Sequence, residues 1–128
     1  MVSVTSNILK EIIKMMPEED LISEADFEGA NIVVYTKDKE FFLDDKGIIK
    51  KAVHEFKKRV ELRPDPSICM EMEKAKGMIE NILPDEAEAD NILFDPQRSM
   101  VVIEAEKPGL AIGKQGQNLR EIKEKTLW

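Results

Sequence analysis

The sequence contains little of what several protein classes require. Cys69 is its only cysteine, so an internal disulfide is impossible and a reducing, cytoplasmic setting is expected. No apolar run approaches the roughly 20 residues of a membrane span. The segment "MVSVTSNILKEIIKMMP" lacks the basic start and cleavage site of a secretory signal. We therefore expect neither a disulfide-stabilised protein nor a membrane-bound or secreted one.

Aromatic residues and catalytic side chains are also scarce. Aromatic residues make up 5% of the chain, so base stacking on Tyr or Trp is not the expected mode of nucleic-acid binding. His54 is the only histidine, and nothing near Cys69 resembles a nucleophilic or redox partner. The acidic segment "PDEAEAD" lacks the spacing of a calcium loop. We expect no catalytic residue, metal site or cofactor here, and hence no enzyme activity.

Acidic residues outnumber basic ones, and the net charge of −7 argues against nonspecific nucleic-acid binding. Two segments depart from this average. Residues 46–59 hold six basic residues and one acidic residue, and residues 107–128 hold five and two. Residues 65–106, in contrast, hold three basic and eleven acidic residues. Solvated helix faces are the ordinary explanation of such runs.

The chain contains an internal repeat. The matched pairs are Pro17 with Pro84 and Phe27 with Phe94 at 67 residues, and Val33-Val34 with Val101-Val102 at 68. We assign the extra residue to a turn, "EGAN" in one copy and "DPQRS" in the other. Each copy then shows an apolar helix, a proline with acidic residues, two strand-like runs, a loop and a second amphipathic helix.

The two copies differ at their ends. The closing helix of the second copy uses Leu119 and Ile122 as its apolar positions. In the first copy, "RVELRPDPS" indicates a strand that ends at Pro64, followed by a stiff linker. Its counterpart in the second copy would begin near residue 129. The repeat thus predicts an α+β fold of two tandem α-β-β-α-β units, 1–64 and 65–128, the second truncated before its last strand. The loop before the glycines has room for a short extra helix.

The segment "GLAIGKQGQNLREI" places two glycines around Lys114 and Gln115 at a predicted helix start. Flexible glycines, free N–H groups and a cation together suit a phosphate. A P-loop is excluded, because three residues rather than four separate Gly109 from Gly113, and Lys114 precedes Gln115 rather than Ser or Thr. A dinucleotide fingerprint fails because residue 111 is not glycine. Two alternatives stay open, the GXXG loop of a KH domain and a simple turn with a solvated lysine.

The segment closely resembles the KH signature, and the helix-first order resembles the type II KH arrangement. This resemblance implies that RNA contacts Ile112, Gly113, Lys114, Gln115 and Gly116, with Ile112 lining the groove. We add Arg120, one turn into the following helix, because it is expected to face the same side. No other residue is predicted to bind RNA through this loop.

The first copy departs from the KH signature in the segment "LDDKG", residues 43–47. Asp44 replaces the first glycine of the loop, and Asp45 follows it. Two carboxylates would repel a phosphate. The first unit, with its degenerate DDKG loop, is therefore predicted to keep the fold without binding RNA through the loop. Two roles stay open for it: contact with nucleic acid through its basic helix, or service as a spacer and packing partner.

Tandem KH units joined by "RPDPS", the first without its GXXG, resemble the N-terminal region of archaeal cleavage-and-polyadenylation-specificity-factor-like ribonucleases. These are β-CASP proteins of the metallo-β-lactamase superfamily. The resemblance covers all 128 residues. It implies a parent protein that processes mRNA 3′ ends and acts in transcription termination, with a zinc-dependent nuclease core outside this segment. None of the family's catalytic residues maps onto this chain.

The resemblance implies single-stranded RNA and the parent nuclease core as partners, with a possible homodimer through the parent and no membrane. It implies no cofactor in this segment and zinc in the parent core. The alternative function is a KH-fold protein–protein interaction or dimerisation module with little RNA binding. The acidic net charge favours this alternative, whereas the intact GKQG loop beside its basic segment favours RNA.

Overall fold

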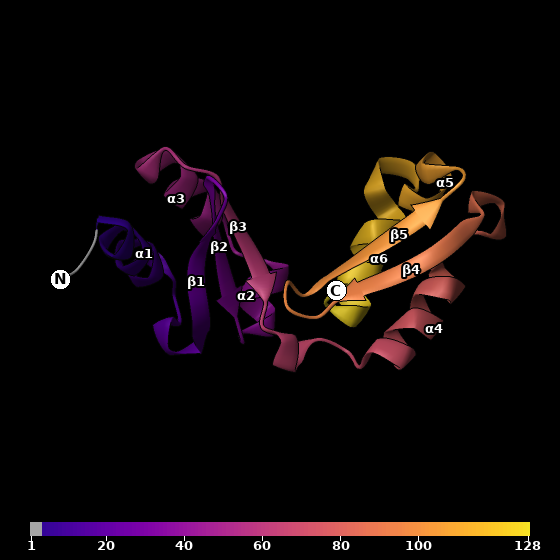
Figure 1. Cartoon of the computed structure of the whole chain (residues 1–128), viewed down its shortest axis with the longest axis horizontal. Helices are drawn as coiled ribbons and strands as arrows, with labels where there is room; N and C mark the ends of the chain where they lie inside the picture. The colour runs from indigo at the N-terminus through magenta and orange to yellow at the C-terminus, as the bar shows by residue number, and fades with distance from the viewer. Residues whose placement is uncertain (1–3) are drawn as a thin grey trace. The chain divides into compact units, whose positions relative to one another are not determined.

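The computed structural model describes the backbone of residues 4–128, and side chains from residue 7 onward. The chain forms two compact units, Met1–Asp65 and Pro66–Trp128 (Figure 1). The first contains α1 (Val4–Met15), β1 (Ile22–Glu28), β2 (Asn31–Thr36), α2 (Lys39–Leu43), α3 (Ile48–Phe56) and β3 (Val60–Pro64). The second contains α4 (Met72–Ile82), β4 (Ala89–Asp95), β5 (Met100–Ala105), α5 (Pro108–Ile112) and α6 (Gln117–Thr126). The α+β class and the helix-first order of both units are confirmed, with α2 and α5 as the short extra helices.

The first unit is a three-stranded sheet in the order β1-β2-β3. β1 runs antiparallel to β2 through a tight turn, whereas β3 runs parallel to β2 because α2 and α3 form the crossover between them. Its core contains Ile12 from α1, Ile32 and Val34 from β2, and Ala52 from α3, all fully buried. Helices α1 and α3 therefore pack on the same face of the sheet.

The second unit builds its core in the same way. Ile79 of α4 and Ile122 of α6 are buried, and the inward residues of β4 and β5, among them Phe94 and Ile103, pack against them. Outward residues of the strands alternate with these, as expected for a sheet with one covered face. Within residues 66–128 the sheet has two strands, β4 and β5, and a counterpart of β3 does not occur.

The strand registers correct the alignment of the two copies. Phe27 pairs with Ile32, and Phe94 pairs with Val101. Ile32, rather than Val33, therefore corresponds to Val101, so the second strands are 69 residues apart instead of the predicted 68. The turn between β4 and β5 is therefore two residues longer than the turn between β1 and β2, rather than one residue longer as predicted. A one-residue slip would move every side chain of the strand to the other sheet face, whereas a two-residue insertion preserves the core positions.

The end of the chain is held against the start of the second unit. The indole N–H of Trp128 donates to the carbonyl oxygen of Met70 at 2.7 Å, and the N–H of Met70 donates to the carbonyl oxygen of Thr126 at 2.9 Å. The Trp128 ring meets Phe94 edge-on, with 4.9 Å between ring centroids. Trp128 is the only tryptophan, so its fluorescence reports on this unit alone.

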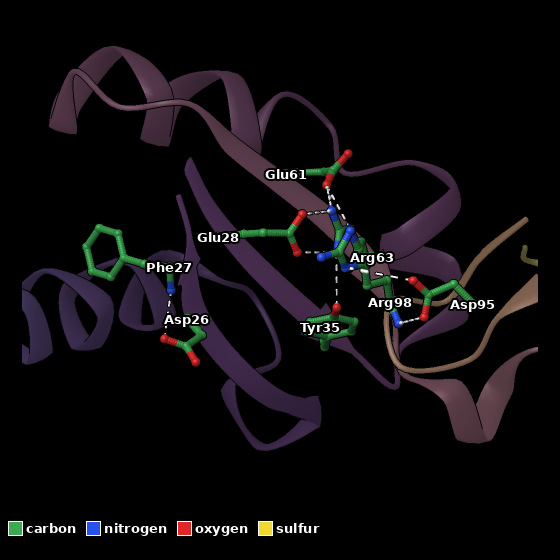
Figure 2. A network of polar contacts seen from close by, with 8 residues as sticks. All are labelled: Asp26, Phe27, Glu28, Tyr35, Glu61, Arg63, Asp95 and Arg98. Atoms are coloured by element: carbon green, nitrogen blue, oxygen red, sulfur yellow. Dashed lines mark hydrogen bonds and ion pairs between the residues drawn. The ribbon is translucent and has the colours of Figure 1, made fainter. Parts of the chain in front are cut away.

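A buried arginine links the three strands of the first unit (Figure 2). Both terminal nitrogens of Arg63 donate to the carboxylate of Glu28, at 2.9 and 3.0 Å, and its Nε donates to Glu61 at 2.7 Å. Arg63 also donates to the Tyr35 hydroxyl at 3.1 Å. The hydrogen bonds to Glu28, with those to Tyr35 and Glu61, hold the pKa of Arg63 above its ordinary value, although burial acts in the opposite direction. The Arg63 guanidinium therefore stays protonated and positively charged in the folded protein.

No helix within the described residues 4–128 is both long and apolar enough to cross a bilayer.

Candidate nucleic-acid interface

The GKQG loop, residues 113–116, joins α5 to α6. Two separate features of the structure, the backbone angles and a close neighbour, require glycine at its first position. Gly113 has φ +83° and ψ 170°, a backbone region essentially restricted to glycine. A Cβ atom at Gly113 would lie 2.9 Å from the side-chain carbon Cγ of Asn118 and 3.0 Å from its backbone nitrogen. Gly116 also has a positive φ of +74°, but a Cβ there would meet open space. The first glycine thus fixes the geometry of the loop.

Three hydrogen bonds hold the loop in shape. The N–H of Gly116 donates to the carbonyl oxygen of Gly113 at 3.1 Å. Asn118 donates from Nδ2 to the carbonyl oxygen of Leu110 at 3.2 Å, and Arg120 donates from Nη1 to the carbonyl oxygen of Gln115 at 2.7 Å. Sequence reasoning placed Arg120 on the loop side of α6 but missed its bond to the loop backbone. It missed Asn118 altogether, because neither contact has a local sequence signature.

The loop presents groups that can bind a phosphate. The side chains of Lys114 and Gln115 are exposed, and α6 begins directly after them at Gln117. The first N–H groups of a helix have no partner within the helix, and the helix dipole places partial positive charge there. An anion beside this loop would therefore meet backbone N–H groups together with the Lys114 ammonium group.

An apolar groove of about 320 Å³ lies beside the loop, between β5, α5 and α6. Val102, Ile112 and Leu119 contribute exposed apolar surface to it, and Ile112 is 42% exposed. Ile112 thus lines an apolar groove, and its contact with RNA stays a prediction. The place of Leu119 in the apolar stripe of the helix suggested a core position, but Leu119 does not belong to the core. It is 44% exposed and lines the groove, whereas Ile122 is 2% exposed.

The last two residues of the first unit's loop have φ values close to those of the GKQG loop, whereas its first residue differs. Lys46 and Gly47 have φ values of +53° and +82°, close to +55° at Gln115 and +74° at Gly116. Asp44, in contrast, has φ −148°, an extended conformation that any residue adopts. Loss of the first glycine has thus changed the entry to the loop and preserved its exit.

The carboxylates of the first loop bind the N–H groups of their own chain. Asp45 accepts from the N–H of Ile49 at 2.9 Å, inside the first turn of α3. Asp44 accepts from the N–H of Lys46 at 3.1 Å. In the second unit the residue equivalent to Asp45 is Lys114, which brings a cation instead of a carboxylate. That the first loop does not bind phosphate stays a prediction, for which these contacts supply a physical mechanism.

A cavity of about 640 Å³, twice the volume of the groove beside the GKQG loop, lies beside this first loop. Phe41, Leu43 and Ile48 line it with apolar surface. The carboxylates at its edge belong to Glu18, Asp38, Glu40, Asp44 and Asp45, against the single cation of Lys46. Its charge is unsuited to a polyanion, so size alone does not identify the nucleic-acid site. The described residues contain no group of three His, Cys, Asp or Glu side chains that could hold a metal ion.

Comparison with known protein families agrees with this geometry. Residues 2–69 match the family described as "Transcription termination factor FttA, KH domain", and residues 74–126 match the KH domain family. The chain belongs to the FttA KH-domain family. The match to two successive KH domains confirms the tandem KH arrangement inferred from the repeat.

Individual relatives are similar along nearly the whole chain. The chain is 46% identical over 125 residues to the transcription termination factor FttA of Methanocaldococcus jannaschii, an alignment that covers 98% of the chain. It is 45% identical over 126 residues to that of Thermococcus kodakarensis and 34% identical over 122 residues to that of Lokiarchaeum. In each case the alignment covers 19% of the relative. The chain thus spans about a fifth of the length of the curated relatives that it matches.

Proposed function

We propose that this chain is a single-stranded RNA-binding tandem KH module whose second unit binds RNA through the GKQG loop. The observation that carries the proposal is the loop itself. A glycine whose conformation and surroundings would strain any other residue holds an exposed lysine near the N-terminus of α6, and an apolar groove lies beside it. In a KH domain such a loop binds the backbone of about four nucleotides.

Each residue of the site has a distinct role in this proposal. Backbone N–H groups of the loop and the Lys114 ammonium group bind phosphate, and Gln115 donates or accepts a further hydrogen bond. Gly113 and Gly116 allow the RNA backbone to approach closely. Ile112, with Leu119, provides the apolar floor on which bases lie. Arg120 acts as a positioning residue, because its bond to the Gln115 carbonyl oxygen fixes the loop.

The names of the relatives extend the proposal to the longer protein. They are transcription termination factors, so we propose that the module supplies RNA for transcription termination and mRNA 3′-end processing in an archaeal cytoplasm. The longer protein would be a zinc-dependent β-CASP ribonuclease, a hydrolase of the metallo-β-lactamase superfamily that dimerises. Zinc belongs to that catalytic core in this proposal, and the module itself acts by binding RNA.

A second candidate function is a protein-interaction module with little RNA binding of its own. The acid-edged cavity of about 640 Å³ in the first unit and the net charge of −7 favour it. Salt dependence separates the two functions. Binding that neutralises phosphates weakens with added salt by a slope of about 0.7 per phosphate on logarithmic axes for single strands.

The proposal is tested by fluorescence anisotropy with short single-stranded RNAs. Lys114→Asp/Gln115→Asp places two acids in the loop, as the first unit already has. The matched control, Lys76→Glu/Asn81→Glu, makes the same charge change on the exposed part of α4. We expect the loop variant to lose about 10- to 100-fold in affinity, equivalent to about 1.5–3 kcal/mol for a charged hydrogen bond. Equal affinities of the loop variant and the control would contradict the proposal.

A further inference from the structure

The solvent face of α3 and its flanks carry mostly basic residues. Between residues 46 and 59 the only acidic residue is Glu55. The basic residues are Lys46, Lys50, Lys51, Lys57, Lys58 and Arg59. The opposite face of the helix packs into the core through Ile49, Ala52 and Phe56, and Ala52 is fully buried. Because this packing fixes the rotation of α3, the lysines of the helix point to solvent. We call the five basic residues from Lys50 to Arg59 the α3 basic face, because Lys46 lies among the carboxylates of the first-loop cavity.

The α3 basic face has no neutralising partners. Within the described part of the chain, none of its five side chains forms an ion pair, whereas Arg63, Arg98 and Lys125 each do. Lys50 and Lys51 are neighbours in α3, and Lys57, Lys58 and Arg59 follow its last residue. Among the described residues Glu55 forms no ion pair with them, so their mutual repulsion costs stability in the free protein. A ligand that supplies negative charge would remove this repulsion.

The acidic residues of the first unit are concentrated elsewhere. Residues 18–28, which include β1, hold six acidic residues and no basic one. β1 and β3 are the two edges of the sheet, and α3 packs against β3. The unit is thus polarised, and its α3 basic face attracts a polyanion although the net charge of the chain is negative. The net charge of the whole chain, −7, does not reveal this local basic surface.

We propose that the α3 basic face binds the phosphate backbone of single-stranded RNA beyond the nucleotides held by the GKQG loop. The inference rests on the proposed function, because the loop of the second unit supplies the first contact. The first unit then binds RNA through the outside of a helix instead of through its DDKG loop, whose carboxylates repel phosphate. This contact is independent of RNA sequence, because phosphates carry no base information.

The test compares RNA of two lengths by anisotropy at several salt concentrations. A probe of about four nucleotides fills one KH loop, and a probe of about 20 nucleotides exceeds it several-fold. The α3 variant is Lys50→Gln/Lys51→Gln/Lys57→Gln. The control, Lys37→Gln/Lys39→Gln/Lys74→Gln, removes the same number of charges elsewhere. Melting followed by circular dichroism verifies that both variants fold.

We expect all three proteins to bind the short probe equally. With the long probe, the α3 variant should bind more weakly than the control. Its salt slope should be smaller by up to about 2, because each lost phosphate contact removes about 0.7. In the unmodified chain, the long probe but not the short one should shift the NMR signals of residues 50–58, a readout that needs no mutation.

Three results would overturn the inference. The first is equal affinity and equal salt slope of the α3 variant and the control with the long probe. The second is equal weakening of both probes, and the third is displacement of the long probe by a glutamate-rich peptide of matched charge. Either of the last two would indicate a general electrostatic field rather than a contact with the RNA backbone. Failure of the proposed function is recognised separately, because the loop variant Lys114→Asp/Gln115→Asp would then leave binding of the short probe unchanged.

Discussion

The two units have the same order of helices and strands from their first helix to the helix after the loop, yet the loop that opens α3 and the loop that opens α6 are suited to opposite charges. In the first, Asp45 uses its carboxylate to bind the N–H of Ile49 in the first turn of the helix. In the second, Lys114 occupies the equivalent position and leaves the start of α6 open to an anion from outside. A carboxylate at this position stabilises the helix, and a lysine keeps a binding site available. On the proposed function, the second unit gives up local stability at this helix start and keeps it open to phosphate.

The strongest test of this comparison is Gly113→Ala. Alanine at φ +83° is strained, and its Cβ would clash with Asn118, so we expect the second unit to lose about 2–4 kcal/mol of unfolding free energy. Gly116→Ala, where a Cβ meets nothing within 4 Å, should cost about 1 kcal/mol. Urea unfolding followed by Trp128 fluorescence measures both. Equal losses would show that the close approach at Gly113 is unimportant.

The next largest effect is expected at Arg63, in the first unit only. Arg63→Leu removes the hydrogen bonds to Glu28, Glu61 and Tyr35 and should cost about 2 kcal/mol, since the partly exposed carboxylates regain water. Arg63→Lys keeps the charge but loses the paired bonds to Glu28, and should cost less. Hydrogen exchange of β2 amides should accelerate, while amides of β5 keep their protection. Acceleration in both units would contradict the assignment of separate cores.

Lys114→Asp should separate stability from binding. An aspartate there can accept from the N–H of Asn118 as Asp45 does from Ile49, so we expect a gain of about 0.5–1 kcal/mol in the second unit. The same change should weaken RNA binding. The reciprocal change, Asp45→Lys, should destabilise the first unit by a similar amount. Chemical unfolding and RNA titration measure the two effects, and a less stable Lys114→Asp variant would refute the equivalence of the loops.

The smallest effect is expected at Arg120. Its bond to the Gln115 carbonyl oxygen is exposed, so Arg120→Ala should cost about 0.5 kcal/mol of stability. If Arg120 positions the loop, RNA affinity should fall several-fold and return in part with Arg120→Lys, which can still donate. A pure phosphate contact would instead change the salt slope by about 0.7. Affinity measured at several salt concentrations distinguishes the two roles.

The sequence was sufficient to predict the element order, because helix and strand periods and turn residues are local signals. It also predicted the loop and placed Ile112 beside it. It did not predict the strand register. The Val-Val pair that occurs in both copies aligns at a separation of 68 residues, whereas the strand registers give 69. The sequence did not predict the contacts of Arg63 and Asn118, for a different reason. They join residues that are distant in the chain or reach a backbone carbonyl, and such contacts leave no pattern in composition or spacing.

The most direct test of the account is an NMR titration of the unmodified chain with a single-stranded RNA of about four nucleotides. Both loops are observed in one experiment, so each unit is the control for the other. We predict that the shifted signals lie within residues 112–120 and that residues 44–49 stay unchanged. Shifts centred on residues 44–49, or equal in both loops, would contradict the claim that Lys114 and its glycines make the second unit the one that binds RNA.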